Sequence, residues 1–279
     1  MIHLMNNVIS IALQEDIGSG DITTDNLIDK DIAGRGVMIA KEPIVLAGLD
    51  VARAVFEFLD PKVIFTSDYK DGEKINDGSI ILTVEGNLRA LLLCERTALN
   101  FLQRLSGIAT YVRSFIDKLG KKNVRLVDTR KTTPGLRILE KYAVRAGGAY
   151  NHRIGLYDGV LIKDNHISVC GGVRQAVERI KKNISHLVKI EIEVSNLSEV
   201  KEALDAEADI IMLDNMDISG IKKAVELIDG QALVEVSGGI TMENMIVLAD
   251  MGVNIISLGA FTHSARFMDI SMRIDPYEK

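Results

Sequence analysis

The spacing of apolar residues changes character near residue 107, and it predicts a different kind of structure on each side. Before that point the predicted elements are mixed. Apolar side chains recur on one helical face over residues 3–16, which predicts a helix. Two glycines and three hydroxyl side chains predict a loop over residues 18–24. Further helices are predicted at 49–59 and 89–119, the second with a break at Gly107 left open, and strands at 36–41, 63–67 and 79–85.

After residue 120, short β-branched runs alternate with helical patterns. Strands are predicted at 124–127, 160–162, 188–194, 210–213, 232–236 and 255–258. Helices are predicted between and after them, at 136–147, 172–182, 196–206, 218–229, 241–251 and 263–271. Such alternation predicts a parallel sheet with helices outside it. The strands are almost continuously apolar, as expected where both faces of a sheet are buried.

The number of strand–helix units narrows the fold class. Six units fit an incomplete α/β (TIM-like) barrel better than a complete eight-fold one. A doubly wound open sheet is the competing topology, and periodicity does not separate the two. Asn196 and Thr241 are predicted to cap the helices that follow them, and Gly148 to end the helix that begins near residue 136.

Composition excludes several classes of protein. The hydrophobic share is 47% and the charged share 26%, which is ordinary for a globular protein in water. No apolar run reaches the roughly 18 residues of a membrane span, and the N-terminal residues lack the pattern of a secretion signal. Cys94 and Cys170 are too few for a disulfide framework, so a reduced, cytoplasmic protein is expected. The acidic balance and the absence of Trp argue against a nucleic-acid surface.

Charge is distributed unevenly. The chain has a net charge of −6, yet residues 128–166 contain seven Lys/Arg against four Asp/Glu, a net charge of +3. A basic segment bounded by apolar strands in an acidic protein predicts a pocket for a small, multiply anionic ligand.

Residues able to do chemistry follow each predicted strand. In parallel α/β folds the C-terminal ends of all strands lie at the same end of the sheet, and ligands bind there. These groups are therefore expected to lie close together. Arg130, Lys131, Arg153 and Lys163 suit carboxylates or phosphates. In order along the chain, the strand ends carry Asp128–Lys131, Lys163–His166, Glu191 and Glu193, Asp214–Asn215, Ser237–Gly239 and Gly259–Ala260.

The remaining strand-end groups have several uses. Small residues at Ser237–Gly239 and Gly259–Ala260 let backbone N–H groups approach a phosphate at a helix N-terminus. Glu193 and Asp214 could hold a divalent cation, hold ribose hydroxyls or stabilise developing positive charge.

Structural roles compete with these functional ones. Arg137, Lys141 and Arg145 repeat every four residues and are predicted to form the solvent-facing side of a helix. One of Glu191 and Glu193 could be a structural salt-bridge partner. His152 and His166 lack further ligands at the spacing of a zinc site. Arg96 lies on a polar stripe of a predicted helix together with Asn100, Gln103 and Arg104. This stripe is either simply exposed to solvent, or it presents an arginine to a binding site across a subunit contact.

The ordered motifs resemble those of the quinolinate phosphoribosyltransferase family over nearly the whole chain. Ala149 and Phe261 depart from the family pattern, and neither change removes a ligand group. The matching motifs are Glu15-Asp-Ile-Gly-Ser-Gly-Asp-Ile-Thr-Thr, Glu95-Arg-Thr-Ala-Leu-Asn, Leu105-Ser-Gly-Ile-Ala-Thr, Asp128-Thr-Arg-Lys-Thr-Thr-Pro-Gly-Leu-Arg, Asn151-His-Arg, Leu161-Ile-Lys-Asp-Asn-His, Ile211-Met-Leu-Asp-Asn, Ser237-Gly-Gly-Ile and Gly259-Ala-Phe-Thr-His-Ser.

The resemblance implies a fold and a reaction. It implies an N-terminal α/β sandwich domain over 1–107 and an incomplete α/β barrel over 108–279, whose last residues are free to pack back on the first domain. It implies condensation of quinolinate with phosphoribosyl pyrophosphate, releasing pyrophosphate and CO2 and giving nicotinate mononucleotide for NAD biosynthesis. A homodimer or larger assembly, Mg²⁺ and no organic cofactor are expected, with no nucleic-acid or membrane partner.

The resemblance also implies the site residues. Lys131, Lys163, Glu193 and Asp214 are the expected catalytic groups, and Glu193 and Asp214 the expected Mg²⁺ ligands. The expected quinolinate pocket comprises Arg96 from the neighbouring subunit with Thr129, Arg130, His152, Arg153 and Lys163. The expected phosphoribosyl pocket comprises Lys131, Glu193, Asp214, Ser237, Gly238, Gly239, Leu258, Gly259 and Ala260.

Three other functions stay open at this point. A related phosphoribosyltransferase could act on another heteroaromatic acid, and release of CO2 separates it from an enzyme acting on quinolinate. A lyase or aldolase could use Lys163 or Lys131 as a Schiff base, which borohydride would trap. A non-catalytic anion-binding protein is the third.

Overall fold

The computed structural model describes residues 2–277, and they form two compact units. The first comprises residues 2–114, 132–148 and 261–277, and the second comprises 115–131 and 149–260. The predicted domains, 1–107 and 108–279, are continuous stretches of sequence, and that division stays a prediction. Within the described residues, no helix is both long and apolar enough to cross a membrane.

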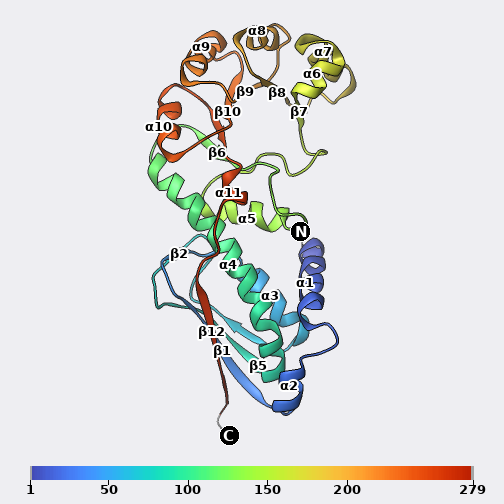
Figure 1. Ribbon diagram of the computed structural model, residues 1–279, viewed down its shortest axis with the longest axis vertical. Helices are drawn as coiled ribbons and strands as arrows, with labels where there is room; N and C mark the ends of the chain where they lie inside the picture. The colour runs from blue at the N-terminus through green and yellow to red at the C-terminus, as the bar shows by residue number, and fades with distance from the viewer. Residues whose placement is uncertain (1, 278–279) are drawn as a thin grey trace. The chain divides into compact units, whose positions relative to one another are not determined.

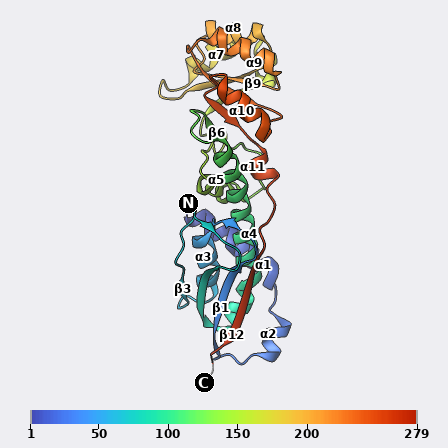
Figure 2. The ribbon, with the colours of Figure 1, turned by 90° about the vertical axis from the view of Figure 1, so that its left-hand side faces the viewer.

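The first unit contains an antiparallel sheet in the order β12-β1-β5-β3 (Figures 1 and 2). Its strands are β1 (Ala33–Ala40), β3 (Ile64–Thr66), β5 (Ile80–Asn87) and β12 (Ile270–Pro276), and β2 (Ile44–Val45) pairs separately with β4 (Lys74–Ile75). Met38 and Ala40 of β1 are buried at alternate positions, because successive side chains of a strand point to opposite faces.

Helices accompany the sheet in the first unit. They are α1 (Ile2–Ile17), α2 (Ile22–Leu27), α3 (Leu49–Leu59), α4 (Leu88–Leu119), α5 (Arg137–Gly147) and the short α11 (Ala260–His263), and of these α2 and α11 were not predicted. Val51, Val55 and Phe56 form the buried stripe of α3, and the Cys94 thiol of α4 donates to the carbonyl of Val55. These contacts place α3 against α4 in the core of the unit.

The loop predicted over residues 18–24 is wrong in its last residues, where α2 begins. Asp21 precedes this helix, and its carboxylate accepts hydrogen bonds from the backbone N–H groups of Thr23 and Thr24. An aspartate in that position satisfies donors that the first turn of a helix leaves unpaired. The hydroxyls of Thr23 and Thr24 suggest a turn in the sequence, whereas these residues lie in the first turn of a capped helix.

The helix predicted over residues 263–271 is also wrong. The chain leaves α11 at His263, and β12 pairs antiparallel with β1, with Met38 opposite Met272. Strands β1 and β12 are more than two hundred residues apart in the sequence. Their pairing is favoured over the helix that the local spacing predicts, because it satisfies the backbone hydrogen-bonding groups of β1, which would otherwise be an open edge of the sheet.

Helix α4 is continuous and has no break at Gly107. A Cβ atom at that position would lie 1.9 Å from the carbonyl oxygen of Arg266. The glycine is therefore needed because the segment before β12 passes against the helix backbone, not because the helix bends there.

The second unit contains a parallel sheet in the order β6-β11-β10-β9-β8-β7. Its strands are β6 (Arg125–Val127), β7 (Val160–Ile162), β8 (Ile190–Val194), β9 (Ile210–Asp214), β10 (Leu233–Ser237) and β11 (Ile255–Ser257). Its helices are α6 (Asp164–Cys170), α7 (Val173–Asn183), α8 (Leu197–Asp205), α9 (Ile218–Ile228) and α10 (Met242–Asp250), of which only α6 was not predicted.

Strand order decides between the two predicted topologies. From β7 to β11 each strand lies next to its successor in the chain, so every right-handed crossover steps in the same direction. The helices then lie on one side of the sheet, and Figure 1 shows α7 to α10 outside an arc of strands. A doubly wound sheet would reverse direction at one point. The incomplete barrel is therefore confirmed, with β6 and β7 as its edges.

Local signals for the helix ends are confirmed. Asn196 Oδ1 accepts the N–H of Glu199 at 3.0 Å, and Thr241 Oγ1 accepts that of Asn244 at 3.3 Å. Gly148 ends α5 with a φ of 105°, which favours glycine. These contacts are made within single turns, which is why the sequence alone predicts them.

Candidate active site

The predicted site residues, apart from Arg96, belong to the second unit, and most of them end or follow strands of its parallel sheet. Glu193 lies near the end of β8, and His152 and Arg153 lie in the segment between α5 and β7. Asp214 ends β9 and pairs directly with Ser237, which ends β10. The N–H of Leu258, just after β11, donates to Val127 at the end of β6. These contacts confirm that the C-terminal ends of the strands lie together at one end of the sheet, as predicted. The roles of the individual residues stay predictions.

Lys163 and Glu193 form an ion pair at this end of the sheet. The Lys163 Nζ lies 2.5 Å from Glu193 Oε1, and the glutamate side chain is only 17% exposed. The resemblance assigns Lys163 to the quinolinate pocket and Glu193 to the phosphoribosyl pocket, so this contact joins two residues with different expected roles. It also keeps the lysine ammonium oriented along the strand ends.

The segment carrying His152 and Arg153 is held by a buried carboxylate. Asp128, which is fully buried, accepts the backbone N–H of His152 at 2.9 Å and the side-chain amide of Asn151 at 2.6 Å. A buried carboxylate with charge-assisted hydrogen bonds fixes its partners strongly. Asp128 was noted as part of a motif but was not assigned a role, and the structure shows that it positions the Asn151-His-Arg segment.

Two arginines lie close enough to influence each other. Burial lowers the pKa of Arg153, and the positive charge of Arg130 lowers it further, while Glu191 and Glu193 act in the opposite direction. Arg153 also donates from Nη1 to the carbonyl of Gly159 at 2.9 Å, which fixes its side chain. Because the two positive charges act on each other, an anion with more than one charge would stabilise both arginines.

His152 meets two buried glutamates from different strands. Its Nε2 lies 2.9 Å from Glu191 Oε2 on β8 and 3.8 Å from Glu235 Oε1 on β10. Glu191 is 5% exposed and Glu235 is 1% exposed. One ligand atom from each of the three lies within 4.8 Å of the others, so this group could hold a metal ion. His166 has a different role, because its Nδ1 accepts the N–H of Lys163 at the start of α6.

Glu235 is a site residue that the sequence interpretation missed. Burial raises its pKa to about 8, and the negative charge of Glu191 also raises it, while His152 lowers it. The available signal was a glutamate in the centre of an otherwise apolar strand, Leu-Val-Glu-Val-Ser, where a charged residue needs a partner.

The turn after β10 has the shape expected for close approach of a ligand to the backbone. Gly238 has a φ of 92° and Gly239 a φ of 60°, and a Cβ on Gly238 would lie 2.1 Å from Asn215 Oδ1. The turn leads into α10, whose N-terminal N–H groups form a positive pole. Asp214 accepts a hydrogen bond from the amide of Asn215 at 2.9 Å, so its carboxylate is oriented beside this turn.

In the first unit, Arg104 and Lys141 are less exposed to solvent than predicted. Arg96 is exposed on α4, but Arg104 on the same stripe is not solvent-facing, since it pairs with buried Glu140 at 2.7 Å and donates to two carbonyls. Lys141 is only 2% exposed, so the predicted solvent-facing stripe of α5 is wrong at that position. Leu139, Glu140 and Val144 are buried too, so α5 is enclosed on more than one side.

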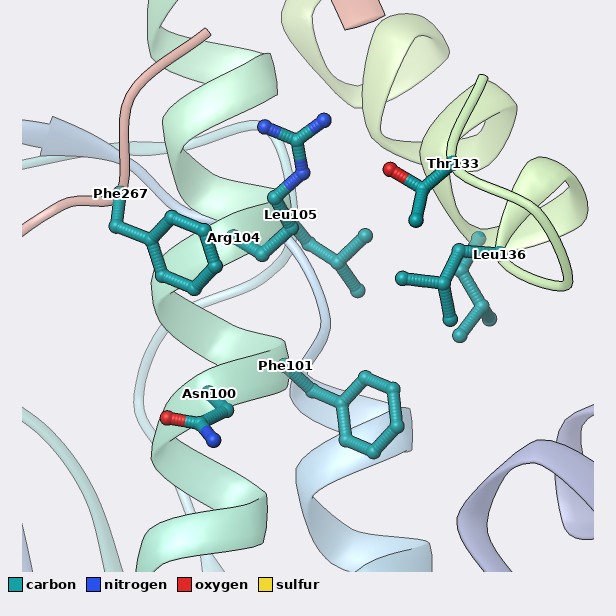
Figure 3. Close-up of a pocket in the computed structure, with 8 residues that line it drawn as sticks. Asn100, Phe101, Arg104, Leu105, Thr133, Leu136 and Phe267 are labelled. Carbon is teal, nitrogen blue, oxygen red and sulfur yellow. The ribbon is translucent and has the colours of Figure 1, made fainter. Parts of the chain in front are cut away.

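A hollow of about 400 Å³ lies within the first unit (Figure 3). Leu105 of α4 and Leu136 point toward each other across it, and Phe101 lies below them in that view. The one guanidinium at its edge belongs to Arg104, which is already paired with Glu140. Its largely apolar lining contrasts with the clustered cations and carboxylates at the strand ends of the second unit.

Comparisons with known proteins agree on one family. The models for the N-terminal and C-terminal domains of quinolinate phosphoribosyl transferase match residues 21–106 and 108–273. A probable nicotinate-nucleotide pyrophosphorylase (carboxylating) of Bacillus subtilis is 43% identical over 260 residues, which is 93% of this chain and 90% of that protein.

A plant relative and a solved structure extend the likeness. A mitochondrial quinolinate phosphoribosyltransferase (decarboxylating) of Nicotiana tabacum is 39% identical, over 97% of this chain and 82% of that protein. The crystal structure of NadC from Streptococcus pyogenes superposes with a TM-score of 0.95 at 40% identity, covering 100% of this chain and 99% of that one.

Proposed function

The chain belongs to the quinolinate phosphoribosyltransferase family, and on that premise we propose that it joins quinolinate to phosphoribosyl pyrophosphate with loss of one carboxylate. The products are nicotinate mononucleotide, pyrophosphate and CO2, and the reaction serves NAD biosynthesis. The enzyme is therefore a decarboxylating pentosyltransferase.

One observation carries the choice of substrate: Arg130 and Arg153 act on each other electrostatically, since the positive charge of Arg130 lowers the pKa of Arg153. Quinolinate has two adjacent carboxylates, and two interacting cations match a dianion better than a single carboxylate. Thr129, His152 and Lys163 complete this pocket in the proposal. Lys163 is half-buried and oriented by Glu193, so its ammonium is positioned before substrate arrives.

The phosphoribosyl half of the site is proposed at the neighbouring strand ends. Backbone N–H groups after β10 lie at the start of α10, where a phosphate is stabilised by the helix dipole. Lys131 is exposed beside Arg130 and supplies a cation for the pyrophosphate. The remaining proposed contacts are Ser237, Gly238, Gly239, Leu258, Gly259 and Ala260.

Glu193 and Asp214 are proposed to act on the ribosyl centre. Departure of pyrophosphate leaves positive charge on the ribose, and a nearby carboxylate stabilises a centre of that kind. Loss of CO2 follows on the bound nucleotide: the bond to the carboxylate breaks, its electron pair stays on the ring carbon beside the cationic nitrogen, which stabilises it, and a proton from solvent then adds to that carbon. Arg130 and Arg153 hold the carboxylates through both stages.

Mg²⁺ is proposed as the metal that accompanies phosphoribosyl pyrophosphate. The donor set fits it, since Glu193 and Asp214 offer the carboxylate oxygens that Mg²⁺ prefers, and both side chains are partly accessible. The ion would neutralise charge on the leaving pyrophosphate. No organic cofactor is needed for this chemistry.

A homodimer in the cytoplasm is proposed for the working enzyme. Arg96 is exposed on α4 and lies in the other compact unit from the remaining pocket residues, which suits an arginine donated to the site of a neighbouring copy. Cys94 is buried and Cys170 is unpaired, as expected for a protein kept under reducing conditions.

An assay with quinolinate, phosphoribosyl pyrophosphate and Mg²⁺ tests the proposal. We expect nicotinate mononucleotide by mass detection and one CO2 for each nucleotide. Turnover with nicotinate but not quinolinate, without CO2, would assign the chain to another acid. A covalent adduct at Lys163 or Lys131 after borohydride treatment would support the Schiff-base alternative instead.

A further inference from the structure

His152 is held by a pair of buried glutamates for which neither the proposed catalytic steps nor the comparisons supply a role. Glu191 and Glu235 come from strands on either side of β9, and both side chains are more than nine-tenths buried. Among the described residues, Oε1 of each of these two glutamates is buried without a hydrogen-bond partner. Carboxyls in such surroundings are kept only where the neighbouring groups compensate for lost hydration.

Glu191 is the nearer of the two carboxyls to the histidine. Nε2 of His152 lies 2.9 Å from Oε2 of Glu191, within hydrogen-bonding distance, and 3.8 Å from Oε1 of Glu235. The contact with Glu191 therefore holds the imidazole ring from a buried position on β8.

We propose that Glu191 is a positioning residue for quinolinate binding, because its contact with Nε2 of His152 fixes the orientation of the ring. The imidazole is thereby held in one orientation when it meets the substrate. This inference rests on the proposed function, since it takes quinolinate as the ligand that His152 meets.

The surrounding charges favour this role over a simple counter-charge. Arg153 is influenced by Glu191 and by Glu193, so removing either negative charge would change the arginine in the same direction. Of these two glutamates, Glu191 lies 2.9 Å from His152, whereas Glu193 is paired with Lys163 at 2.5 Å. A role through the histidine is therefore separable from a role through Arg153.

The test is a double-mutant cycle between Glu191→Gln and His152→Ala. Glutamine keeps the size of the side chain but loses its charge, and we expect the KM for quinolinate to rise about tenfold, the usual effect of losing one charge-assisted hydrogen bond. The KM for phosphoribosyl pyrophosphate and kcat should change less than about twofold. Glu202→Gln, an exposed residue on α8, is the matched control.

Non-additivity is the decisive outcome. If Glu191 acts through His152, adding Glu191→Gln to His152→Ala causes no further rise in the KM for quinolinate. Equal effects in both backgrounds would overturn the proposal and assign Glu191 to Arg153. A fall in kcat together with a rise in both KM values and a lower Tm would also overturn it, as a general structural role.

A measurement without substrate separates this inference from the proposed function. In ¹⁵N-histidine NMR of the whole protein, we expect the ring-nitrogen signals of His152 to shift between the wild type and Glu191→Gln, because the contact at Nε2 changes. The inference fails if both proteins give the same His152 spectrum. It also fails if the purified wild type retains one zinc or manganese that Glu191→Gln loses, because the three side chains would then be metal ligands. The proposed function fails separately, if quinolinate is not turned over.

Discussion

Replacing Glu235 by glutamine should change how the stability of the protein depends on pH. The side chain is 1% exposed, and burial raises its pKa from an ordinary value of 4.5 to about 8, with Glu191 adding to the effect. Folding therefore favours the protonated carboxyl. Glutamine is similar in size, stays neutral at every pH and can still donate to Glu191, so it mimics the protonated form without titrating.

The sign and the size of the effect follow from proton linkage. Below pH 4.5 the carboxyl is protonated in both the folded and unfolded states, so the wild type and Glu235→Gln should have similar stability. Between pH 4.5 and about 8 only the unfolded state releases the proton, and the wild type loses stability relative to the variant. At about 1.4 kcal/mol per pKa unit, the difference reaches about 5 kcal/mol near pH 8.

Urea unfolding of both proteins at several pH values between 4.5 and 9 measures this difference directly. Groups that titrate equally in the two proteins cancel, so the difference in free energy of unfolding isolates residue 235 and its neighbours. We expect it to grow steadily and to level off above pH 8. Two stability curves that run parallel over the whole range would refute the reasoning, since Glu235 would then have an ordinary pKa.

Three further predictions concern the proposed site. Arg130→Ala should raise the KM for quinolinate about a hundredfold, because it removes a charged hydrogen-bonding group, and near-normal turnover at low quinolinate would exclude this arginine from the pocket. Gly238→Ala should lower the free energy of unfolding by about 1–3 kcal/mol, because a Cβ would overlap Asn215 and φ is 92°; thermal unfolding checks it, and an unchanged Tm would contradict it. Removing Mg²⁺ with a chelator should abolish turnover, and added Mg²⁺ should restore it; full activity in the chelator would show that no free divalent metal is needed.

Parts of the fold depend on signals that lie close together in sequence. The parallel strands were predictable because strands buried on both faces are continuously apolar, and helices of ordinary length separate them. The caps at Asn196 and Thr241 were predictable because each donor and acceptor lie three residues apart. The helix α2 was missed even so, because hydroxyls and an aspartate are common to turns and to helix starts.

Contacts between distant segments explain the other errors. Strand β12 is a strand because β1 offers it a partner, and no property of residues 270–276 alone shows that partner. Lys141 follows a surface-like spacing and is nevertheless 2% exposed, because spacing along a helix does not reveal what packs against each side. The break left open at Gly107 had the same origin, since the close approach of Arg266 is visible only after folding.

By itself, the sequence determined the order and type of the barrel elements, the basic segment at residues 128–166 and the chemistry expected at each strand end. It did so because hydrophobic period, turn residues and charge are local properties. Only the tertiary structure decided the strand order that makes an incomplete barrel, the contact of Lys163 with Glu193, and the meeting of His152 with Glu191 and Glu235. These depend on which strands become neighbours, and that is set by the joint burial of the whole sheet rather than by any one segment.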